Sequence, residues 1–361
     1  LIKLNDQNNF FINQNYGVLD KNFNSSIKAQ ITIDDRLIKG RLKLNGQTNS
    51  HREIFSFSFK SKINVFEDNS NYDYSFRTIK ERSIYDHLVS KLFKEKGLLA
   101  TQIKYYELKL NGKNLGIYAV QDNINNNFLE DNGYRGGPVI ALRNYHFESQ
   151  YFTTNIIEKE KYTDGYLEDV NDDTKNLEIS DYAIEKLKKF IYEKRDINEL
   201  FDINYWAKYF ALCEIYLCYD LDTQDIRFYF NPITEKFIPI LDDPHSNLSG
   251  QMSTFSDSFF YKRGGYLSYF EHHHYFILNS FFTNRSFLKE YNLQLSKLIN
   301  NKTIPDSPYI NRINTSENIF NPDFYLNRIN FLNTKLKNEK ILFSSLDISE
   351  PNSHYLYIDL I

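Results

Sequence analysis

Polar and apolar positions in the first third of the chain alternate in the way that is typical of β-strands. Alternating or β-branched runs cover Ser26–Ile33, Leu37–Leu44 and Ile54–Phe66. In the third run, phenylalanines alternate with serines and with Lys60. Because successive side chains of a strand point to opposite faces, this run predicts a ladder of Phe rings on one face and Lys60 on the other.

A helix is predicted after these strands. Apolar residues, among them Leu88 and Leu92, recur at helical spacing over Ile84–Lys96. Gly97 follows directly, and a glycine at this position is a common way to end a helix. The sequence therefore predicts one helix between two groups of strands.

A β-hairpin comes next. The apolar runs Ile103–Leu110 and Leu115–Val120 are separated by Asn111-Gly112. Asn-Gly between two such runs is the strongest short signal for a hairpin, since both residues adopt the positive φ angles that the turn needs. A short helix is predicted at Asn125–Asp131.

The character of the sequence changes after Asn144. The segment Glu158–Asn176 is polar and acidic, and it favours a solvated insertion or long loop. A hairpin is predicted from Ile226–Phe230 and Lys236–Leu241. Helical patterns cover most of the rest, at Asp181–Glu193, Asn204–Tyr219, Ser286–Leu298 and Pro322–Lys337.

These elements predict an α+β fold in two parts. Residues 1–122 form a β-rich part with one helix, and residues 123–361 form a mainly helical part with the acidic insertion near 158–176. That order is the order of a protein-kinase-like two-lobe fold, with a β-rich N-lobe, a hinge and a helical C-lobe. Fold alone does not determine function, so function has to be inferred from particular residues.

Composition excludes several classes of protein. A hydrophobic fraction of 41% and a charged fraction of 25% are ordinary for a globular chain. The net charge of −4 gives no basic footprint for nucleic acid, and no apolar run approaches the roughly 18 residues of a membrane span. Two cysteines, Cys213 and Cys218, exclude a disulfide framework and a four-cysteine zinc site. The chain begins at Leu1, so both a fragment and a mature form stay open.

The most informative segment is a cluster of aspartates around the second hairpin. Asp220 and Asp225 lie five positions apart before the hairpin, and Asp242 and Asp243 follow it. In protein kinases a catalytic aspartate and a metal-binding asparagine have this spacing, and another metal-binding aspartate follows. Carboxylate oxygens are also the ligands that Mg²⁺ prefers. A solvated acidic turn is the alternative that the spacing alone leaves open.

Two blocks carry a resemblance to a known family. The first is Leu-Asn-Gly-Lys-Asn-Leu-Gly-Ile-Tyr-Ala-Val-Gln-Asp-Asn-Ile over Leu110–Ile124, and the second runs from Arg-Phe-Tyr-Phe-Asn at Arg227 to Pro-Ile-Leu-Asp-Asp at Asp243. Together they resemble the signatures of the CotH family of spore-coat-type kinases. The similarity extends from about Leu37 to Asp243.

The resemblance implies roles for particular acidic residues. The catalytic aspartate of the family falls on Asp220, its metal ligands fall on Asp225 and Asp243, and Asp242 is an alternative metal ligand. An acidic residue at the hinge, near the base and ribose of the nucleotide, falls on Asp122. ATP and Mg²⁺, or Mn²⁺, are the implied cofactors.

The phosphate-binding lysine is the main departure from the family. The family places it just before a Ser-Phe pair, and here Phe55 precedes Ser56. Substitutes are available on the polar faces of the neighbouring strands, so we expect Lys60, or failing that Lys62 or Lys43, to enter the cleft. In the family a helix glutamate orients the lysine, and that position falls on Asp86.

Two further clusters have simpler interpretations. The run His272–His274 favours a surface loop over a metal site, because consecutive residues do not converge on one ion. Apolar residues at helical spacing between Trp206 and Leu217 form the buried stripe of the helix that precedes Asp220. That stripe would fix the position of the acidic loop.

Three functions follow from these patterns. The first is a CotH-like protein kinase that transfers the γ-phosphoryl of ATP to a protein hydroxyl, that of Ser. The second is a pseudokinase that serves as a structural surface or coat protein, and the third is an interaction module for a partner or glycan. The resemblance implies a secreted or cell-surface location and a coat or envelope protein as substrate, with no nucleic acid partner.

Overall fold

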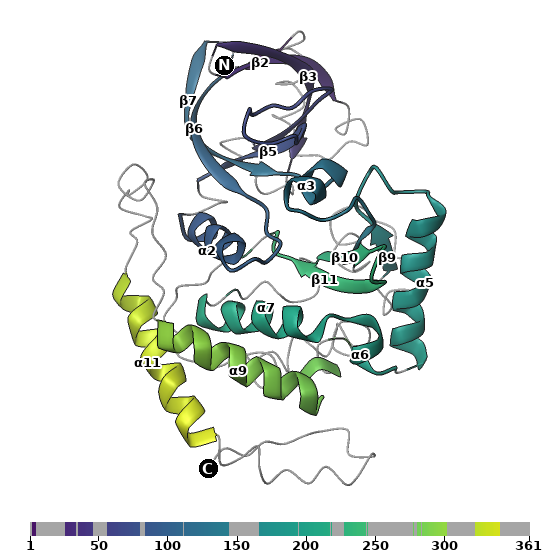
Figure 1. Ribbon diagram of the computed structural model, residues 1–361. Helices are drawn as coiled ribbons and strands as arrows, with labels where there is room; N and C mark the ends of the chain where they lie inside the picture. Colours follow the sequence, from purple (N-terminus) through teal and green to yellow (C-terminus); the bar gives the residue numbers. More distant parts are fainter. Residues whose placement is uncertain are drawn as a thin grey trace, which may run out of the picture.

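The computed structural model describes residues 2–4, 26–33, 35–45, 56–79, 84–110, 112–143, 166–193, 195–216, 218, 227–242, 244, 277, 280–282, 284–301 and 322–339. These residues form an α+β fold (Figure 1). Among the predicted site residues, Asp220, Asp225 and Asp243 lie outside the described ranges, as do His272–His274.

Seven strands close into a β-barrel in the first part of the chain. Its order is β1-β2-β3-β4-β5-β7-β6, and all neighbours are antiparallel except β1 and β6. The bounds are β1 Ile2–Leu4, β2 Ile27–Ile33, β3 Arg36–Asn45, β4 Ser56–Ser61, β5 Asp73–Thr78, β6 Ile103–Leu110 and β7 Lys113–Asp122. The predicted Phe-rich strand and the predicted hairpin therefore belong to one barrel.

The barrel has an apolar interior and a polar outer face. Phe57 and Phe59 of β4 are fully buried inside it, with Tyr74 and Phe76 of β5 beside them. Lys60 points to the outer face, as the alternation predicts. Burial of these rings supplies the driving force for closure, since apolar burial contributes about 25 cal/mol per Å².

Helix α2 (Ile84–Glu95) ends at the predicted glycine. Gly97 has a φ of +71°, a conformation that costs little only for glycine. Its amide donates to the Lys94 carbonyl, and the Leu98 amide donates to the Phe93 carbonyl, each at 2.9 Å. This pattern of paired hydrogen bonds is the Schellman motif, and it turns the chain toward β6.

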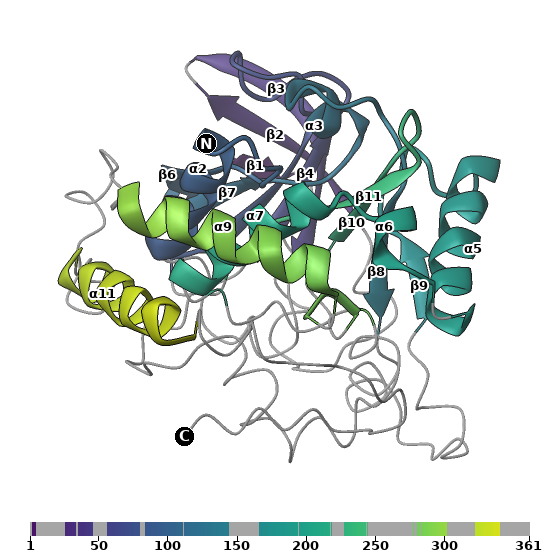
Figure 2. The ribbon, with the colours of Figure 1, turned by 60° about the horizontal axis from the view of Figure 1, so that its bottom comes forward.

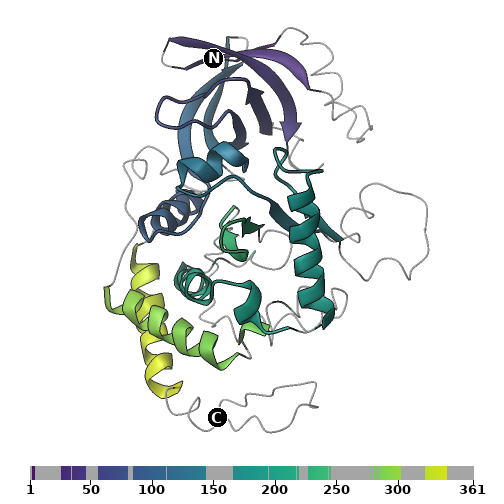
Figure 3. The ribbon, with the colours of Figure 1, turned by 45° about the vertical axis from the view of Figure 1, so that its right-hand side comes forward.

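The second part of the chain contains a four-stranded antiparallel sheet and most of the helices (Figure 1). The sheet has the order β11-β10-β8-β9, with bounds β8 Val139–Arg143, β9 Tyr166–Asp169, β10 Arg227–Asn231 and β11 Lys236–Ile240. The helices are α3 Asn126–Asp131, α5 Glu178–Glu193, α6 Ile197–Leu200, α7 Ile203–Tyr216, α9 Arg285–Asn301 and α11 Pro322–Glu339. Figure 3 shows this sheet between the barrel at one end and α9 with α11 at the other.

The expectation of a solvated loop is wrong for Tyr166–Asp169, whereas the residues after them form turns in which Asp172, Asp173 and Lys175 are exposed. Tyr166–Asp169 forms strand β9 at the edge of the second sheet. Asp169 is buried because its carboxylate accepts hydrogen bonds from the amides of Val139 and Asn171 and from the Thr174 hydroxyl. Acidic residues here satisfy backbone donors, which a count of charges along the sequence does not reveal.

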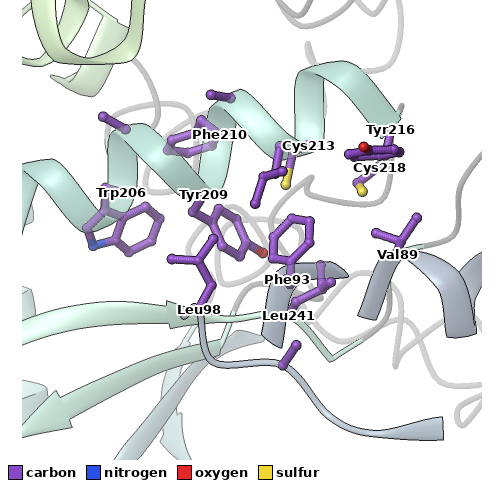
Figure 4. Packing of buried hydrophobic residues seen from close by; sticks show 14 of the residues in the cluster. Val89, Phe93, Leu98, Trp206, Tyr209, Phe210, Cys213, Tyr216, Cys218 and Leu241 are labelled. Atoms are coloured by element: carbon purple, nitrogen blue, oxygen red, sulfur yellow. The ribbon is translucent and has the colours of Figure 1, made fainter. Parts of the chain in front are cut away.

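Helix α7 forms the centre of the second core. Tyr209 packs edge-on against Phe93 of α2, with Leu98 close by (Figure 4), whereas Phe210 packs against Phe281 and Phe287. The Trp206 indole donates to the Phe237 carbonyl of β11 at 2.9 Å. Helix α9 runs alongside α7 (Figure 2). Trp206, Tyr209, Phe210 and Cys213 of α7 are buried, as predicted, and so are most of the residues between them, while Leu217 lies outside the described residues.

Helix α11 is held against α7 by a buried ion pair. Arg328 contacts the carboxylate of Glu214 at 2.6 Å and its carbonyl at 3.0 Å. Tyr291 of α9 donates to the other carboxylate oxygen of Glu214 at 3.0 Å. One glutamate therefore connects three helices. None of the helices in the described part of the chain is both long and apolar enough to cross a membrane.

Candidate nucleotide site

The barrel and the second sheet are joined next to Asp242. Ala100, just before β6, bridges to Leu241, just after β11. The Thr101 amide donates to the Leu241 carbonyl, and the Leu241 amide donates to the Leu99 carbonyl, each at 2.9 Å. These backbone hydrogen bonds fix the end of β11, and Asp242 is the residue that follows.

The side chain of Gln121 holds Asp242 from the barrel side. Its amide nitrogen lies 2.6 Å from the Asp242 carbonyl oxygen and 3.1 Å from the Asp242 carboxylate. The same nitrogen is 2.8 Å from the Thr101 hydroxyl. Gln121 is only 3% exposed, so these contacts replace water almost completely.

A pocket of about 860 Å³ lies between the outer face of β2–β5 and the second sheet. Its acidic lining residues in the described part are Asp73, Asp172 and Asp242. Its basic lining residues are more numerous: Lys28, Lys39, Arg41, Lys43, Lys60, Lys62, Arg77 and Arg227. The described lining therefore carries a net positive charge, which suits a polyanionic ligand.

Strand register orders this face into rows. Lys43 lies opposite Ser58, Ser58 opposite Ser75, and Ser75 opposite Gln121. This row leads to Asp242, because Gln121 contacts it.

A second row of side chains lies two residues further along these strands, on the side away from Asp242. In it, Lys28 lies opposite Arg41, Arg41 opposite Lys60, and Lys60 opposite Asp73. Lys60 therefore lies in a different row from Gln121, the residue that contacts Asp242.

Lys60 lines the pocket between two carboxylates. Its ammonium is 3.1 Å from Asp172 and 3.8 Å from Asp73, and it lies over the Tyr72 ring at 5.6 Å. Burial lowers the pKa of Lys60, but the hydrogen bond to Asp172 and the charge of Asp73 outweigh it, so the pKa is raised. Lys60 makes these ion pairs rather than the expected one with Asp86.

The turn after β9 closes one side of the pocket. Besides the contact of Asp172 with Lys60, Asp173 accepts a hydrogen bond from the Tyr72 hydroxyl at 2.8 Å and one from the Asn126 amide at 2.9 Å. The turn therefore connects β9 to the barrel and to the start of α3. Sequence reasoning missed these residues, since only the acidic run was visible.

Asp73 has an environment that opposes ionisation. Burial raises the pKa of Asp73 more than the hydrogen bond from Asn123 and the charge of Lys60 lower it. The Asn123 amide donates to Asp73 at 2.7 Å, and its oxygen accepts from the Ser75 hydroxyl at 2.7 Å. This network fixes the segment after β7 beside the pocket.

Asp242 is paired with an arginine across the pocket floor. Its second carboxylate oxygen is 3.6 Å from Arg227 of β10. Arg227 stands within the second sequence block, but nothing in the spacing indicated its role. Asp242 therefore has a guanidinium and an amide as partners, and its assignment as an alternative metal ligand stays a prediction. The metal assignments of Asp225 and Asp243 stay predictions.

Asp122 and Asp86 lie away from the pocket lining. Asp122 is buried opposite Tyr74 and accepts a hydrogen bond from the Gln102 amide at 3.1 Å. Burial raises the pKa of Asp122 to about 6. The three residues after it, Asn123–Asn125, line the pocket instead.

Asp86 is 3% exposed in the first turn of α2. The neighbouring residue Tyr85 packs against Tyr325 of α11, with ring centroids 6.3 Å apart. The pKa of Tyr325 is raised mainly by burial and to a smaller extent by the charge of Asp86.

Comparison with known families adds an independent observation. Residues 42–342 match the family described as CotH kinase protein, which covers most of the chain. The chain belongs to the CotH kinase family. No curated protein matches it.

Membership of the CotH kinase family makes the chain a kinase-like protein and extends the resemblance well beyond Asp243. Helices α9 and α11 lie within the matched range, so they are part of the CotH kinase unit. In the described ranges, no group of three or more His, Cys, Asp or Glu side chains is arranged to hold a metal ion. The expected metal ligands other than Asp242 lie outside those ranges.

Proposed function

We propose that the chain is a protein kinase that binds ATP in the pocket between the barrel and the second sheet and transfers its γ-phosphoryl group to a serine hydroxyl. The observation that carries this proposal is the pocket itself. It combines a basic lining with Asp242, held at its floor by Gln121, directly before the predicted metal ligand Asp243. Family membership supports the same reaction.

In this proposal the barrel with α2 is the N-lobe and the rest of the chain is the C-lobe, with the boundary at Asp122. Helix α2 lies between β5 and β6 in the chain, and the segment Asn123–Asn125 connects the lobes beside the pocket. A hinge next to the nucleotide is the arrangement on which kinase catalysis depends, because positioning supplies much of the rate enhancement.

Arg77 is the best candidate for the phosphate-binding cation. In protein kinases this cation is carried on the strand before the first helix of the N-lobe, and here β5 precedes α2 and carries Arg77. Arg77 lines the pocket and lies two residues along β5 from Ser75, whose cross-strand partner Gln121 contacts Asp242. Its planar guanidinium can donate to two phosphate oxygens at once.

Lys60 and Lys43 remain candidates for the outer part of the nucleotide. Lys43 shares a row with Ser58 and Ser75, and it faces the same pocket. Lys60 contacts Asp172 and Asp73, so a phosphate would have to compete with two carboxylates for it. We therefore place Lys60 nearer the ribose than the γ-phosphate.

The acidic residues would complete the reaction. Asp220 would accept the proton of the serine hydroxyl as its oxygen attacks the γ-phosphorus, while the bond to the bridging oxygen breaks and ADP leaves. Asp225 and Asp243 would hold Mg²⁺ or Mn²⁺, which would supply charge to neutralise the triphosphate.

A transfer assay tests this proposal. The protein is incubated with γ-labelled ATP and with Mg²⁺ or Mn²⁺, and label is measured in the protein itself and in a casein-like substrate. We expect label on serine that is lost in Asp220→Asn, and retained in the control Asp323→Asn, which changes an exposed aspartate on α11. ATP binding without any transfer would refute the kinase.

A pseudokinase is the second candidate, and a specific contact favours it. The ammonium group of Lys60 is already paired with Asp172 and Asp73. Within the described residues, no ion pair joins Asp86 to any of the three candidate lysines, Lys43, Lys60 and Lys62. A chain that binds ATP in this pocket and transfers no phosphate would be this structural or nucleotide-sensing form, acting on a cell surface or coat.

A further inference from the structure

We infer that the outer basic surface, formed by Lys28, Lys39, Arg41 and Lys62, binds an extended acidic segment of the protein substrate. The inference rests on the proposed function, since it names the class of substrate for that site. All four side chains are exposed, and all four line the pocket on the side away from Asp242.

Like charges meet across these strands. Lys28 of β2 lies directly opposite Arg41 of β3, and Arg41 lies opposite Lys60 of β4. The Cβ atoms of directly opposite residues are about 5 Å apart, and like charges at such positions destabilise a sheet. Only the last member of the row, Lys60, reaches carboxylates. The row therefore holds positive charge that the fold does not need for its own stability.

The four outer cations are not neutralised internally. Within the part of the chain that the structure describes, none of them forms an ion pair. Arg41 is nevertheless fixed in direction, because its guanidinium donates to the hydroxyl of Ser26 at 2.6 Å and to its carbonyl at 2.7 Å. A cation that is held in place by neutral partners is prepared to bind an anion with little loss of side-chain entropy.

The spacing along β3 matches an extended peptide. Lys39 and Arg41 are two residues apart on the same face, and a strand rises about 3.3 Å per residue, so their Cα atoms are about 6.6 Å apart. A peptide that runs along β3 with acidic residues at every second position presents carboxylates at the same interval. Lys28 and Lys62 flank β3 on either side.

The nucleotide does not account for these residues. Arg77, the proposed phosphate-binding residue, lies toward Gln121 and Asp242, and Lys43 and Lys60 are assigned to the outer part of the nucleotide. Lys28 and Arg41 lie beyond Lys60, on strands β2 and β3. A nucleic acid is disfavoured too, because the chain carries a net charge of −4 and carboxylates line the same pocket. A protein segment with separate carboxylates fits best.

Peptide binding without ATP tests the inference. A fluorescent peptide with Glu at every second position and one central Ser is compared by anisotropy with the same peptide in which Gln replaces Glu. The full chain is used, together with Lys39→Gln/Arg41→Gln. The matched control is Lys109→Gln/Lys113→Gln, which removes two exposed charges from the β6–β7 hairpin of the same barrel, outside the pocket lining.

We expect the Glu peptide to bind better than the Gln peptide, with an affinity that falls as salt is added. Lys39→Gln/Arg41→Gln should weaken binding about tenfold, while the control stays within about twofold of the unmodified chain. Equal binding of the two peptides, or equal loss in the control, would overturn the inference.

Tighter binding of a single-stranded oligonucleotide through the same residues would also overturn it. If the Glu peptide binds as expected but ATP does not bind, the docking surface stands and the proposed kinase fails. If ATP binds and the Glu peptide does not, the docking surface fails alone.

Discussion

Gln121 and Asp242 are joined by two hydrogen bonds from a single side-chain amide, although they lie 121 residues apart in the sequence. Gln121 is near the end of the last barrel strand before the hinge, and Asp242 directly follows the second sheet. The contact therefore fixes the distance between the two walls of the pocket. It also fixes the start of the segment that contains the predicted metal ligand Asp243.

Replacing Gln121 with Leu should destabilise the chain and weaken ATP binding together. The change leaves the Asp242 carbonyl with only the longer hydrogen bond from the Thr101 hydroxyl, at 3.2 Å, and removes the amide donor to the Asp242 carboxylate. Loss of these buried contacts costs about 1–3 kcal/mol in the free energy of unfolding. Urea denaturation and nucleotide titration measure the two effects. The control is Gln294→Leu on α9, which removes a Gln–Glu hydrogen bond far from the pocket. If ATP affinity fell equally in both variants, Gln121 would have no special role in the pocket.

Much of the backbone was predictable because each element has its own local signal. The period-two pattern correctly predicted β4. Gly97 correctly predicted the end of α2, where this glycine adopts a positive φ. Strand β5 was missed, although Tyr74 and Phe76 alternate correctly with polar residues, because the strand follows a polar, turn-rich segment.

The site was less predictable because it depends on register and on chain folding over long distances. The position of Lys60 opposite Asp73 follows from how β4 pairs with β5, which no single segment encodes. The contact between Asp172 and Lys60 joins residues more than a hundred positions apart. The family resemblance gave the order of the acidic residues along the chain. It predicted that Asp86 would pair with the phosphate-binding lysine, whereas Lys60 pairs with Asp172.

Asp122→Asn should stabilise the chain at neutral pH. Burial raises the pKa of Asp122 from 3.8 to about 6, so the folded state binds a proton more tightly than the unfolded state. Stability therefore rises as the pH falls from about 6 toward 4, and the charged carboxylate costs up to about 3 kcal/mol above pH 6. The asparagine variant keeps an oxygen to accept the Gln102 amide and removes this cost.

Denaturation at pH 4 and pH 8 checks the effect at Asp122. The variant should exceed the unmodified chain in stability at pH 8, and the two should converge at pH 4. Asp131→Asn, which changes a more exposed carboxylate at the end of α3, is the control, and an equal gain in its stability at pH 8 would show that the burial of Asp122 is not the cause. If the variant is less stable at both pH values, the ionised carboxylate of Asp122 stabilises the folded state, which would contradict this account.

Breaking the ion pair of Glu214 and Arg328 should be among the most damaging single changes. Both side chains are almost fully buried, and removal of one leaves the other charge without its partner. Arg328→Met should lower the free energy of unfolding by about 3–5 kcal/mol, whereas Glu214→Gln/Arg328→Met should recover part of the loss.

The comparison for this pair is an exposed one. Lys188→Met removes the contact with Glu185 on the surface of α5, where the expected loss is below about 1 kcal/mol. Equal losses in Arg328→Met and Lys188→Met would show that α11 is not held to α7 by this pair.

Calorimetric titration with ATP and with adenosine tests the central claim most directly. If the pocket holds a nucleoside triphosphate, the chain binds ATP with Mg²⁺ more tightly than adenosine, and Arg77→Met lowers ATP affinity about 10- to 100-fold while adenosine affinity stays the same. Lys109→Met, which removes an exposed charge outside the pocket lining, should leave both unchanged. Equal affinities for ATP and adenosine, or no binding of either, would contradict the account.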